Sequence, residues 1–468
     1  MLVEQKDLGS ATSSASSKLV HGGLRYLEQF EFRLVAEALA EREVLLRTAP
    51  HLVQPMRFVM PHVAELRPAW VIRTGLLLYD WLARRQTLPG SSRVNLAQEP
   101  YNSGLKPQYA SGYTYSDCWV DDARLVVANA RAAADLGAQI MPRTACVSAQ
   151  RESGGWRAQL RHAHGEMEIR TRVIVNAAGP WADRFLSLVT GELAQAQLKL
   201  VQGSHIVVPQ LYEGDHAFIV QNDDGRVIFL YGYEKIYTLI GTTELPLHGD
   251  PGVCHATADE VDYLCRAANR YFTRQLNPSD VAWSYCGVRA LVDDGAANPS
   301  RLTREYLLHL DGDTNRAPLL SVLGGKITTY RRLAERVLEK VEPWLSQLGQ
   351  PWTASATLPG GELPDGVQAY TNSLIERYPR LPSGLVCALV RRHGSCVPAV
   401  LGTACKETDL GELFGGQLYS REIDYFIAHE WAREAEDVLW RRTKAGLHLS
   451  LDQQAKVRGY MARRLAGV

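Results

Sequence analysis

Apolar residues recur at helical spacing in many parts of the chain. In residues 32–47, the apolar residues Phe32, Val35, Leu39 and Val44 sit at helical spacing. The same spacing predicts helices over residues 66–85, 121–136, 258–277, 329–344, 367–377, 385–393, 421–445 and 452–464. Because every element predicted after residue 352 is a helix, we expect the C-terminal part of the chain to form a helical domain.

Between residues 205 and 244 the spacing changes to that of short β-strands. Runs rich in Val, Ile and Tyr, separated by Gly, Asp and Asn turns, cover residues 205–210, 217–221, 226–233 and 236–243. They predict an antiparallel sheet. Short strands are also expected at 139–141 and 147–150, and the near-continuous apolar runs at 170–181 and 319–323 are typical of buried parallel strands. The antiparallel region therefore lies between two α/β segments.

Length and composition narrow the class of protein. A chain of 468 residues is too long for one core, so two or three domains are expected. Its apolar fraction of 46% is ordinary for a soluble enzyme, and Lys plus Arg and Asp plus Glu both number 51, so no net charge favours nucleic acid. We expect neither a signal peptide nor a membrane-spanning run.

The eight cysteines show no metal-binding pattern. They form no C-x-x-C pair and no zinc-like spacing, so no metal site is expected. We interpret them as reduced, mostly buried thiols of a cytosolic protein.

The helix predicted over residues 66–85 has two interpretations. It carries Trp70 and Trp81 among other apolar residues and is flanked by the basic residues Arg67, Arg73, Arg84 and Arg85. This combination suits a helix that lies in a membrane interface. A core helix with a solvated basic edge has the same pattern, and it is the more common case.

A stretch rich in small hydroxyl residues is the strongest candidate for chemistry. Residues 11–26 read Ala-Thr-Ser-Ser-Ala-Ser-Ser-Lys-Leu-Val-His-Gly-Gly-Leu-Arg-Tyr. Hydroxyls and unpaired backbone N–H groups at a helix start suit a phosphate or pyrophosphate. A Ser-rich loop with a helix cap is the alternative.

These residues also carry a resemblance. The stretch resembles the flavin-contacting loop of the FAD-dependent glycerol-3-phosphate dehydrogenases, which belong to the superfamily that includes the D-amino-acid oxidases. The likeness continues in family order through Tyr115-Ser-Asp-Cys-Trp-Val-Asp-Asp-Ala-Arg-Leu125, Gly203-Ser-His-Ile-Val-Val-Pro209, Ile240-Gly-Thr-Thr-Glu244, Gly287-Val-Arg-Ala-Leu291, Thr303-Arg-Glu-Tyr306 and Gly324-Gly-Lys-Ile-Thr-Thr-Tyr330. It covers essentially the whole chain.

The resemblance implies an α/β fold with three parts. A Rossmann-like FAD-binding domain is expected from residues 1–45, 110–200 and 295–348. An inserted antiparallel-sheet substrate domain would comprise residues 46–109 and 201–294, and a C-terminal helical domain residues 349–468.

Glu4 is the predicted ribose ligand. In a dinucleotide-binding fold an acid ends the second strand, about 20 residues after a G-x-G-x-x-G turn. No G-x-G-x-x-G occurs in this sequence. We therefore expect the first strand, its glycine turn and its helix to be missing, and we expect the chain as written to hold FAD poorly.

The resemblance also implies the other cofactor ligands. They are Thr12, Ser13, Ser14, Ser17 and Lys18 in the hydroxyl-rich loop, Ala177 and Gly179 after the run at 170–181, and Gly324, Gly325 and Thr328.

Oxidation of a phosphorylated secondary alcohol requires cations and a base. By resemblance Arg25, Tyr26, Arg304 and Lys326 contact the substrate, and Arg289 lies beside the reacting hydroxyl. His205 and His21 are the candidate proton acceptors because histidine titrates near neutrality, and His205 is preferred.

The implied reaction converts sn-glycerol 3-phosphate to dihydroxyacetone phosphate. Hydride passes to flavin N5 and electrons continue to a membrane quinone, which implies a cytoplasmic protein bound peripherally to the inner membrane. A homodimer is left open. Two alternatives remain: a related amine or amino-acid oxidase, and a non-catalytic fragment unable to hold FAD.

Overall fold

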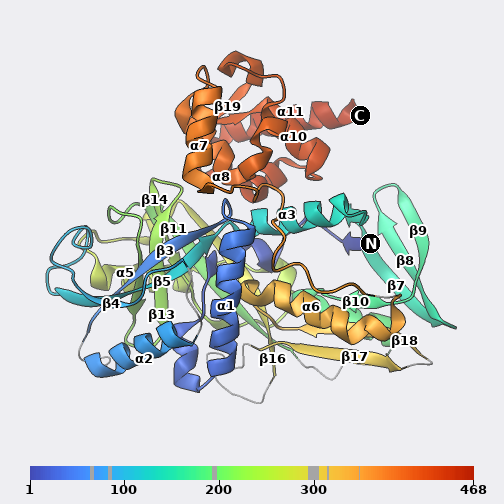
Figure 1. Ribbon diagram of the computed structural model, residues 1–468, viewed down its shortest axis with the longest axis horizontal. Helices are drawn as coiled ribbons and strands as arrows, with labels where there is room; N and C mark the ends of the chain where they lie inside the picture. The colour runs from blue at the N-terminus through green and yellow to red at the C-terminus, as the bar shows by residue number, and fades with distance from the viewer. Residues whose placement is uncertain are drawn as a thin grey trace.

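The computed structural model describes residues 1–63, 68–82, 87–191, 198–293, 305–313, 316–346 and 348–467. Sheets and their covering helices form the larger part of the molecule, and the C-terminal helices form a separate layer at the top of the view (Figure 1). The α/β fold class and the C-terminal helical domain predicted from the sequence are confirmed.

A ten-stranded sheet dominates the larger part. Its strands are β2 (Leu19–Val20), β3 (Val53–Pro61), β4 (Ser92–Asn95), β5 (Ser111–Val120), β11 (Leu198–Pro209), β12 (Ala217–Gln221), β13 (Val227–Tyr233), β14 (Tyr237–Gly241), β15 (Leu245–Pro246) and β16 (Trp283–Val292). The predicted antiparallel pairing is confirmed for β11–β14 and β12–β13–β14. The sheet also takes up β5 and β2, which lie in or beside segments predicted for the FAD-binding domain.

Helices cover both faces of this sheet. On β11, Ile206 and Val208 pack in one apolar core with α5 (Ala258–Tyr271), whereas Val207 packs in another with α1 (Phe32–Thr48) and α2 (Ala69–Trp81). Successive side chains of a strand point to opposite faces, so a strand covered on both sides needs apolar residues at consecutive positions.

One predicted helix is shorter in the structure, and the ends of another lie outside the described residues. Residues 64–67 and 83–86, at the ends of the helix predicted over 66–85, lie outside the described residues. The helix predicted over 258–277 ends at Tyr271, because the Asn269 side chain bonds the backbone N–H and C=O of Leu276 and closes a loop there.

The parallel strands are short. β1 (Leu2–Glu4) pairs with β6 (Ile140–Pro142), and β10 (Ile174–Asn176) pairs with β18 (Arg316–Leu323). β17 (Leu307–Asp313) continues the latter sheet, and β7 (Ala145–Glu152), β8 (Gly155–His162) and β9 (Gly165–Thr171) form a separate antiparallel one. Within the described residues no strand joins β1 to β10.

The single strand predicted over 170–181 is wrong. The chain leaves β9 at Thr171, whose hydroxyl donates to the Val173 carbonyl, and resumes as the three-residue β10. α3 (Asp122–Asp135) and α6 (Tyr330–Val341) fall inside the helices predicted at these positions, and α4 (Ala182–Thr190) follows β10.

The C-terminal helices enclose a core of their own. α7 (Gly366–Arg377), α8 (Ser383–His393), α9 (Val397–Leu401), α10 (Ser420–His429) and α11 (Leu451–Ala466) bury Leu385, Val386, Ile423, Phe426 and Val457. Buried ion pairs of Arg124 with Glu430 and of Arg442 with Asp7 connect this layer to the rest.

The continuous helix predicted over 421–445 is wrong. Helix α10 ends at His429, Trp431 takes a φ of 57°, and a π-helical segment spans Asp437–Arg442. The Asp437 carboxylate accepts hydrogen bonds from the backbone N–H groups of Arg433 and Glu434, which satisfies a new helix start.

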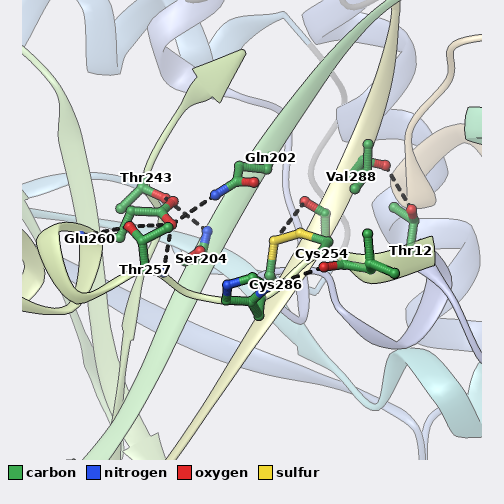
Figure 2. The surroundings of a disulfide bond; sticks show 12 residues. Thr12, Gln202, Ser204, Thr243, Cys254, Thr257, Glu260, Cys286 and Val288 are labelled. Carbon is green, nitrogen blue, oxygen red and sulfur yellow. Dashed lines mark hydrogen bonds between the residues drawn. A yellow bond between two sulfur atoms is a disulfide. The ribbon is translucent and has the colours of Figure 1, made fainter. Parts of the chain in front are cut away.

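Two cysteines contradict the expectation of reduced thiols. Cys254, in the loop before α5, forms a disulfide with Cys286 on β16 (Figure 2). Sequence spacing could not reveal this pair, because the fold brings together residues 32 positions apart. Of the six others, only Cys118 and Cys265 are buried, and Cys387 and Cys405 are exposed.

Candidate active site

The cations assigned to the substrate come from separate parts of the chain. Arg25 and Tyr26 lie in the 3₁₀ segment Leu24–Gln29, and the Lys326 ammonium lies 3.8 Å from the centre of the Tyr26 ring. The close approach is a cation–π contact across 300 positions of sequence. Arg304 lies outside the described residues.

Arg289 on β16 is held by three successive residues. Its Nη1 donates to Glu244 Oε1 at 2.8 Å, and its Nη2 donates to Thr242 Oγ1 and to the Thr243 carbonyl, both at 3.2 Å. Gly203 on the neighbouring strand makes room for this guanidinium, because a Cβ there would lie 2.6 Å from Nη2. Glu244 Oε2 is also 3.9 Å from Arg25 Nη1, so one carboxylate connects both arginines.

His205 is buried on β11. Its Nε2 lies 2.8 Å from Ser17 Oγ. Its ring stacks on the ring of Tyr285, with 4.7 Å between the two ring centres. Gly241 on β14 is required for this placement, since a Cβ there would lie 2.0 Å from the imidazole ring. Burial, with Arg289 and Lys18 nearby, lowers the pKa of His205 well below its usual value. The imidazole is therefore neutral at pH 7 and able to accept a proton.

His21 lies beside a predicted cofactor ligand. The Thr328 hydroxyl is within hydrogen-bond distance of the backbone N–H and C=O of His21, at 3.2 and 3.3 Å. Burial first, then the charges of Lys326 and Arg42, lower the pKa of His21 to about 4. Both predicted proton acceptors are thus neutral near pH 7, for the same physical reason.

A large cavity borders β16, the strand that carries Arg289. It has a volume of about 2400 Å³ and extends between β1, β10 and β16. Of the predicted cofactor ligands, those that line it are Glu4, Thr12, Ser13, Ser14, Ala177 and Gly179. Gly287 and Val288 also border it, so the cavity lies next to Arg289 along β16.

The other predicted cofactor ligands lie away from the cavity wall. Lys18 is buried and donates to both carboxylate oxygens of Asp122, at 2.8 and 3.0 Å. The Ser17 hydroxyl is hydrogen-bonded to His205. Gly324 and Gly325 have φ values of 81° and 107° and form the turn that leads from β18 to Lys326. The turn requires glycine, because other residues rarely adopt such values.

Comparison with known proteins identifies the family. Residues 1–331 match the model of the FAD dependent oxidoreductases, and residues 351–466 match the C-terminal domain of alpha-glycerophosphate oxidase. The chain belongs to the FAD-dependent oxidoreductases.

Relatives of this oxidoreductase are similar over nearly its full length. It is 50% identical over 461 residues to a glycerol-3-phosphate dehydrogenase of Pseudomonas aeruginosa, covering 98% of this chain and 90% of that one. It is 48% identical over 458 residues to a D-erythritol 1-phosphate dehydrogenase of Brucella abortus, covering 97% and 91%. The solved glycerol-3-phosphate dehydrogenase from Bacillus halodurans complexed with FAD superposes with a TM-score of 0.74 at 26% identity, covering 100% of this chain and 85% of that one.

The residues of this oxidoreductase fit part of its cofactor, since the sequence holds no G-x-G-x-x-G turn for the pyrophosphate. Small-molecule sites commonly enclose about 300–1,000 Å³, so a cavity of about 2400 Å³ has room for an extended dinucleotide. Glu4 and Thr12–Ser14 border this space, and the Glu4 carboxylate is suited to a ribose hydroxyl. The Thr12 hydroxyl donates to the Val288 carbonyl at 2.7 Å, which joins the loop to β16. Gly287 lets this loop lie directly against β16, since a Cβ there would be 2.6 Å from the Ala15 carbonyl.

Sequence reasoning missed three acids of the site. Glu244 holds Arg289, Asp122 holds Lys18, and the buried Glu260 holds the Thr243 hydroxyl. Glu244 ends the Ile240-Gly-Thr-Thr-Glu244 motif and Asp122 lies in the motif that begins at Tyr115, so both were within the resemblance. A signal for them existed: a charged residue predicted to be buried requires a partner of opposite charge.

Proposed function

We propose that this oxidoreductase is an FAD-dependent dehydrogenase of sn-glycerol 3-phosphate that forms dihydroxyacetone phosphate. The observations that carry the proposal are that Glu244 connects Arg25 with Arg289, that Lys326 lies over the ring of Tyr26 next to Arg25, and that β16 carries Arg289 beside Val288 of the cavity wall. Two or more cationic donors are what a phosphate ester requires, whereas an amino-acid carboxylate needs one arginine. We keep the three-part domain division, with residues 1–45, 110–200 and 295–348 binding the cofactor, as part of this proposal.

The side chains divide the chemistry between them. Arg25, Tyr26 and Lys326 bind and orient the phosphate end, and Arg289 polarises the hydroxyl on carbon 2. Oxidation of that alcohol removes a hydride and a proton, and bound FAD is the two-electron oxidant. The hydroxyl proton goes to a neutral histidine: to His21, or to His205 through the Ser17 hydroxyl that contacts its Nε2.

A second phosphorylated polyol is a specific alternative substrate. The Brucella abortus relative named for D-erythritol 1-phosphate is almost as similar as the one named for glycerol 3-phosphate. Both compounds combine a phosphate ester with a secondary hydroxyl, so the cation cluster alone does not separate them.

Dye-linked oxidation by the purified chain with added FAD tests the proposal. We expect kcat/KM for sn-glycerol 3-phosphate to exceed that for D-erythritol 1-phosphate at least tenfold, and no turnover with glycine or D-alanine. A reversed order of the two phosphates would assign the alternative substrate. Turnover of an amino acid without turnover of either phosphate would reject both.

The pH dependence of turnover follows from the lowered histidine pKa values. A base whose pKa is about 4 stays unprotonated as the pH falls from 8 to 5, so it loses no activity in that range. The phosphate ester takes up its proton near pH 6. We therefore expect kcat at saturating substrate to change less than twofold between pH 8 and 5.5, while KM rises on the acid side. A kcat that falls tenfold around pH 6.5 would indicate a histidine of ordinary pKa as the base.

We further propose that the protein binds the cytoplasmic face of a membrane peripherally and passes its electrons to a quinone there. No helix in the described ranges is long and apolar enough to cross a bilayer. Helix α2 instead exposes large apolar side chains: Trp70 is 71% exposed, Leu77 57% and Trp81 89%. Phe30, 78% exposed, directly follows the segment Leu24–Gln29, which packs beside α2. Exposed aromatic residues on one helix suit the interface of a bilayer.

Replacing both Trp70 and Trp81 by serine should weaken this association. Both side chains are mostly exposed, so the free energy of unfolding should change little. We expect the fraction that sediments with vesicles of anionic and zwitterionic lipid to fall at least threefold, with dye-linked activity in solution unchanged. The matched control is Trp352→Ser, another exposed tryptophan, 54% accessible, outside α2. Equal sedimentation of wild type and the double variant would contradict the membrane assignment of α2.

A further inference from the structure

Glu244 is a carboxylate placed among the cations of the substrate site. Its side chain is 10% exposed, with one oxygen 2.8 Å from Arg289 Nη1 and the other 3.9 Å from Arg25 Nη1. A negative charge here opposes the binding of a phosphate dianion, because like charges repel strongly where water is excluded. Affinity for phosphate therefore does not explain why this residue is glutamate.

The contacts of Arg289 suggest what Glu244 does. A guanidinium is planar and its donors lie in a rigid fork, so acceptors on both terminal nitrogens fix its plane as well as its position. Glu244 supplies the acceptor at Nη1, and Thr242 Oγ1 and the Thr243 carbonyl supply those at Nη2. Arg25, by contrast, has only the longer 3.9 Å approach to this carboxylate.

The segment that holds Arg289 is itself anchored (Figure 2). Thr243 Oγ1 accepts from the Ser204 backbone N–H at 2.8 Å and donates to Glu260 Oε1 at 2.6 Å. Glu260 is 3% exposed, and its other oxygen accepts from Gln202 Nε2 and from the Thr257 backbone N–H. Thr257 and Glu260 form the capping box of α5, so the segment is tied to both β11 and a helix start.

We propose that Glu244 is a positioning residue: it aims Arg289 at the reacting hydroxyl and keeps that arginine from binding the phosphate. The phosphate is then left to Arg25 and Lys326. This inference rests on the proposed function, because it divides the cations between the two ends of a phosphorylated alcohol. The Ile240-Gly-Thr-Thr-Glu244 motif then has a role, because its last three residues hold the Arg289 guanidinium in place.

Two substitutions change the charge of Glu244 and the length of its side chain separately. Glu244→Gln keeps an acceptor of the same length but removes the charge, so phosphate repulsion disappears and the opposite charge that holds Arg289 away from the phosphate is lost. Glu244→Asp keeps the charge but withdraws it by one methylene, so repulsion persists while the bond to Arg289 is lost. A merely structural role would not move phosphate affinity and turnover in opposite directions.

The experiment measures inorganic phosphate binding by calorimetry and kcat by dye reduction in the same preparations. For Glu244→Gln we expect the phosphate Kd to fall three- to tenfold and kcat to fall ten- to a hundredfold. For Glu244→Asp we expect the Kd to stay within twofold and kcat to fall at least tenfold. Glu213→Gln, an exposed glutamate of the same sheet region, is the matched control and should change neither value.

A Glu244→Gln variant that binds phosphate no more tightly than wild type, or that keeps wild-type kcat, would overturn the inference. Failure of the wild-type chain to oxidise sn-glycerol 3-phosphate would count against the proposed function alone. In that case the phosphate titration still decides the role of Glu244: a lowered Kd upholds its separation of Arg289 from the anion, and an unchanged Kd rejects it.

Discussion

Replacing Arg289 by alanine is expected to lower kcat with sn-glycerol 3-phosphate by about 10²–10³-fold, the effect of removing one preorganised donor from a developing oxyanion. The guanidinium is fixed by Glu244, Thr242 and Thr243 before substrate arrives, so little reorganisation is needed during the reaction. Flavin binding by the variant should equal that of the wild-type chain, because Arg289 is not among the residues that line the cavity. Steady-state kinetics and the visible spectrum of the same sample measure both outcomes.

Lys326→Ala should act on the same reaction differently. Lys326 is assigned to the phosphate end, so kcat/KM should fall about 10²-fold with a larger share of the loss in KM. Arg266→Ala is the control for both variants, since Arg266 is an exposed residue of α5 that pairs with Asp262 one turn away. Near-normal kcat/KM in both Arg289→Ala and Lys326→Ala would reject the assignment of these cations.

The periodicity of the chain predicted the elements well where local pattern decides them. Runs at 217–221 and 226–233 became β12 and β13 almost residue for residue, because the Asn222-Asp-Asp-Gly225 turn separates them. The helix predicted over 421–445 failed because tertiary contacts interrupt it. Asp437 caps a new start and pairs with Arg143 from another part of the fold, which no local pattern reveals.

The candidate site was predicted as a set of residues, but their arrangement could not be predicted. Resemblance supplied Arg25, Lys326 and Arg289, and the structure brings Arg25 and Arg289 to one carboxylate and sets Lys326 over the ring next to Arg25. The sequence alone could not show which acidic residue pairs with each cation. Two glycines helped to set the arrangement. Gly203 leaves space for the Arg289 guanidinium and Gly241 leaves space for the His205 ring. The sequence does not show this space, because it depends on which residues of neighbouring strands lie side by side.

Breaking the ion pair between Lys18 and Asp122 is expected to have the largest effect on stability. Both side chains are almost fully buried, and Asp122 also accepts from the backbone N–H and hydroxyl of Ser16 and from the Ala123 N–H. Lys18→Met leaves that carboxylate buried without its cation, which typically costs about 3–5 kcal/mol. Lys18 also holds a φ of 51°, a left-handed backbone that its Nζ contacts to Asp122 and the Ser14 carbonyl stabilise.

Urea unfolding followed by tryptophan fluorescence measures this loss. Lys199→Met is the matched control, because the Lys199–Asp293 pair is more than one-third exposed and such surface pairs contribute about 0–1 kcal/mol. Adding Asp122→Asn to Lys18→Met should recover part of the loss, since the amide removes the unpaired charge and keeps an acceptor for Ser16. A loss below about 1 kcal/mol in Lys18→Met would contradict the role of this pair. FAD affinity should fall together with stability in Lys18→Met. Lys18 bonds the Ser14 carbonyl and the Ser16 hydroxyl, and so positions Thr12–Ser14 at the cavity wall.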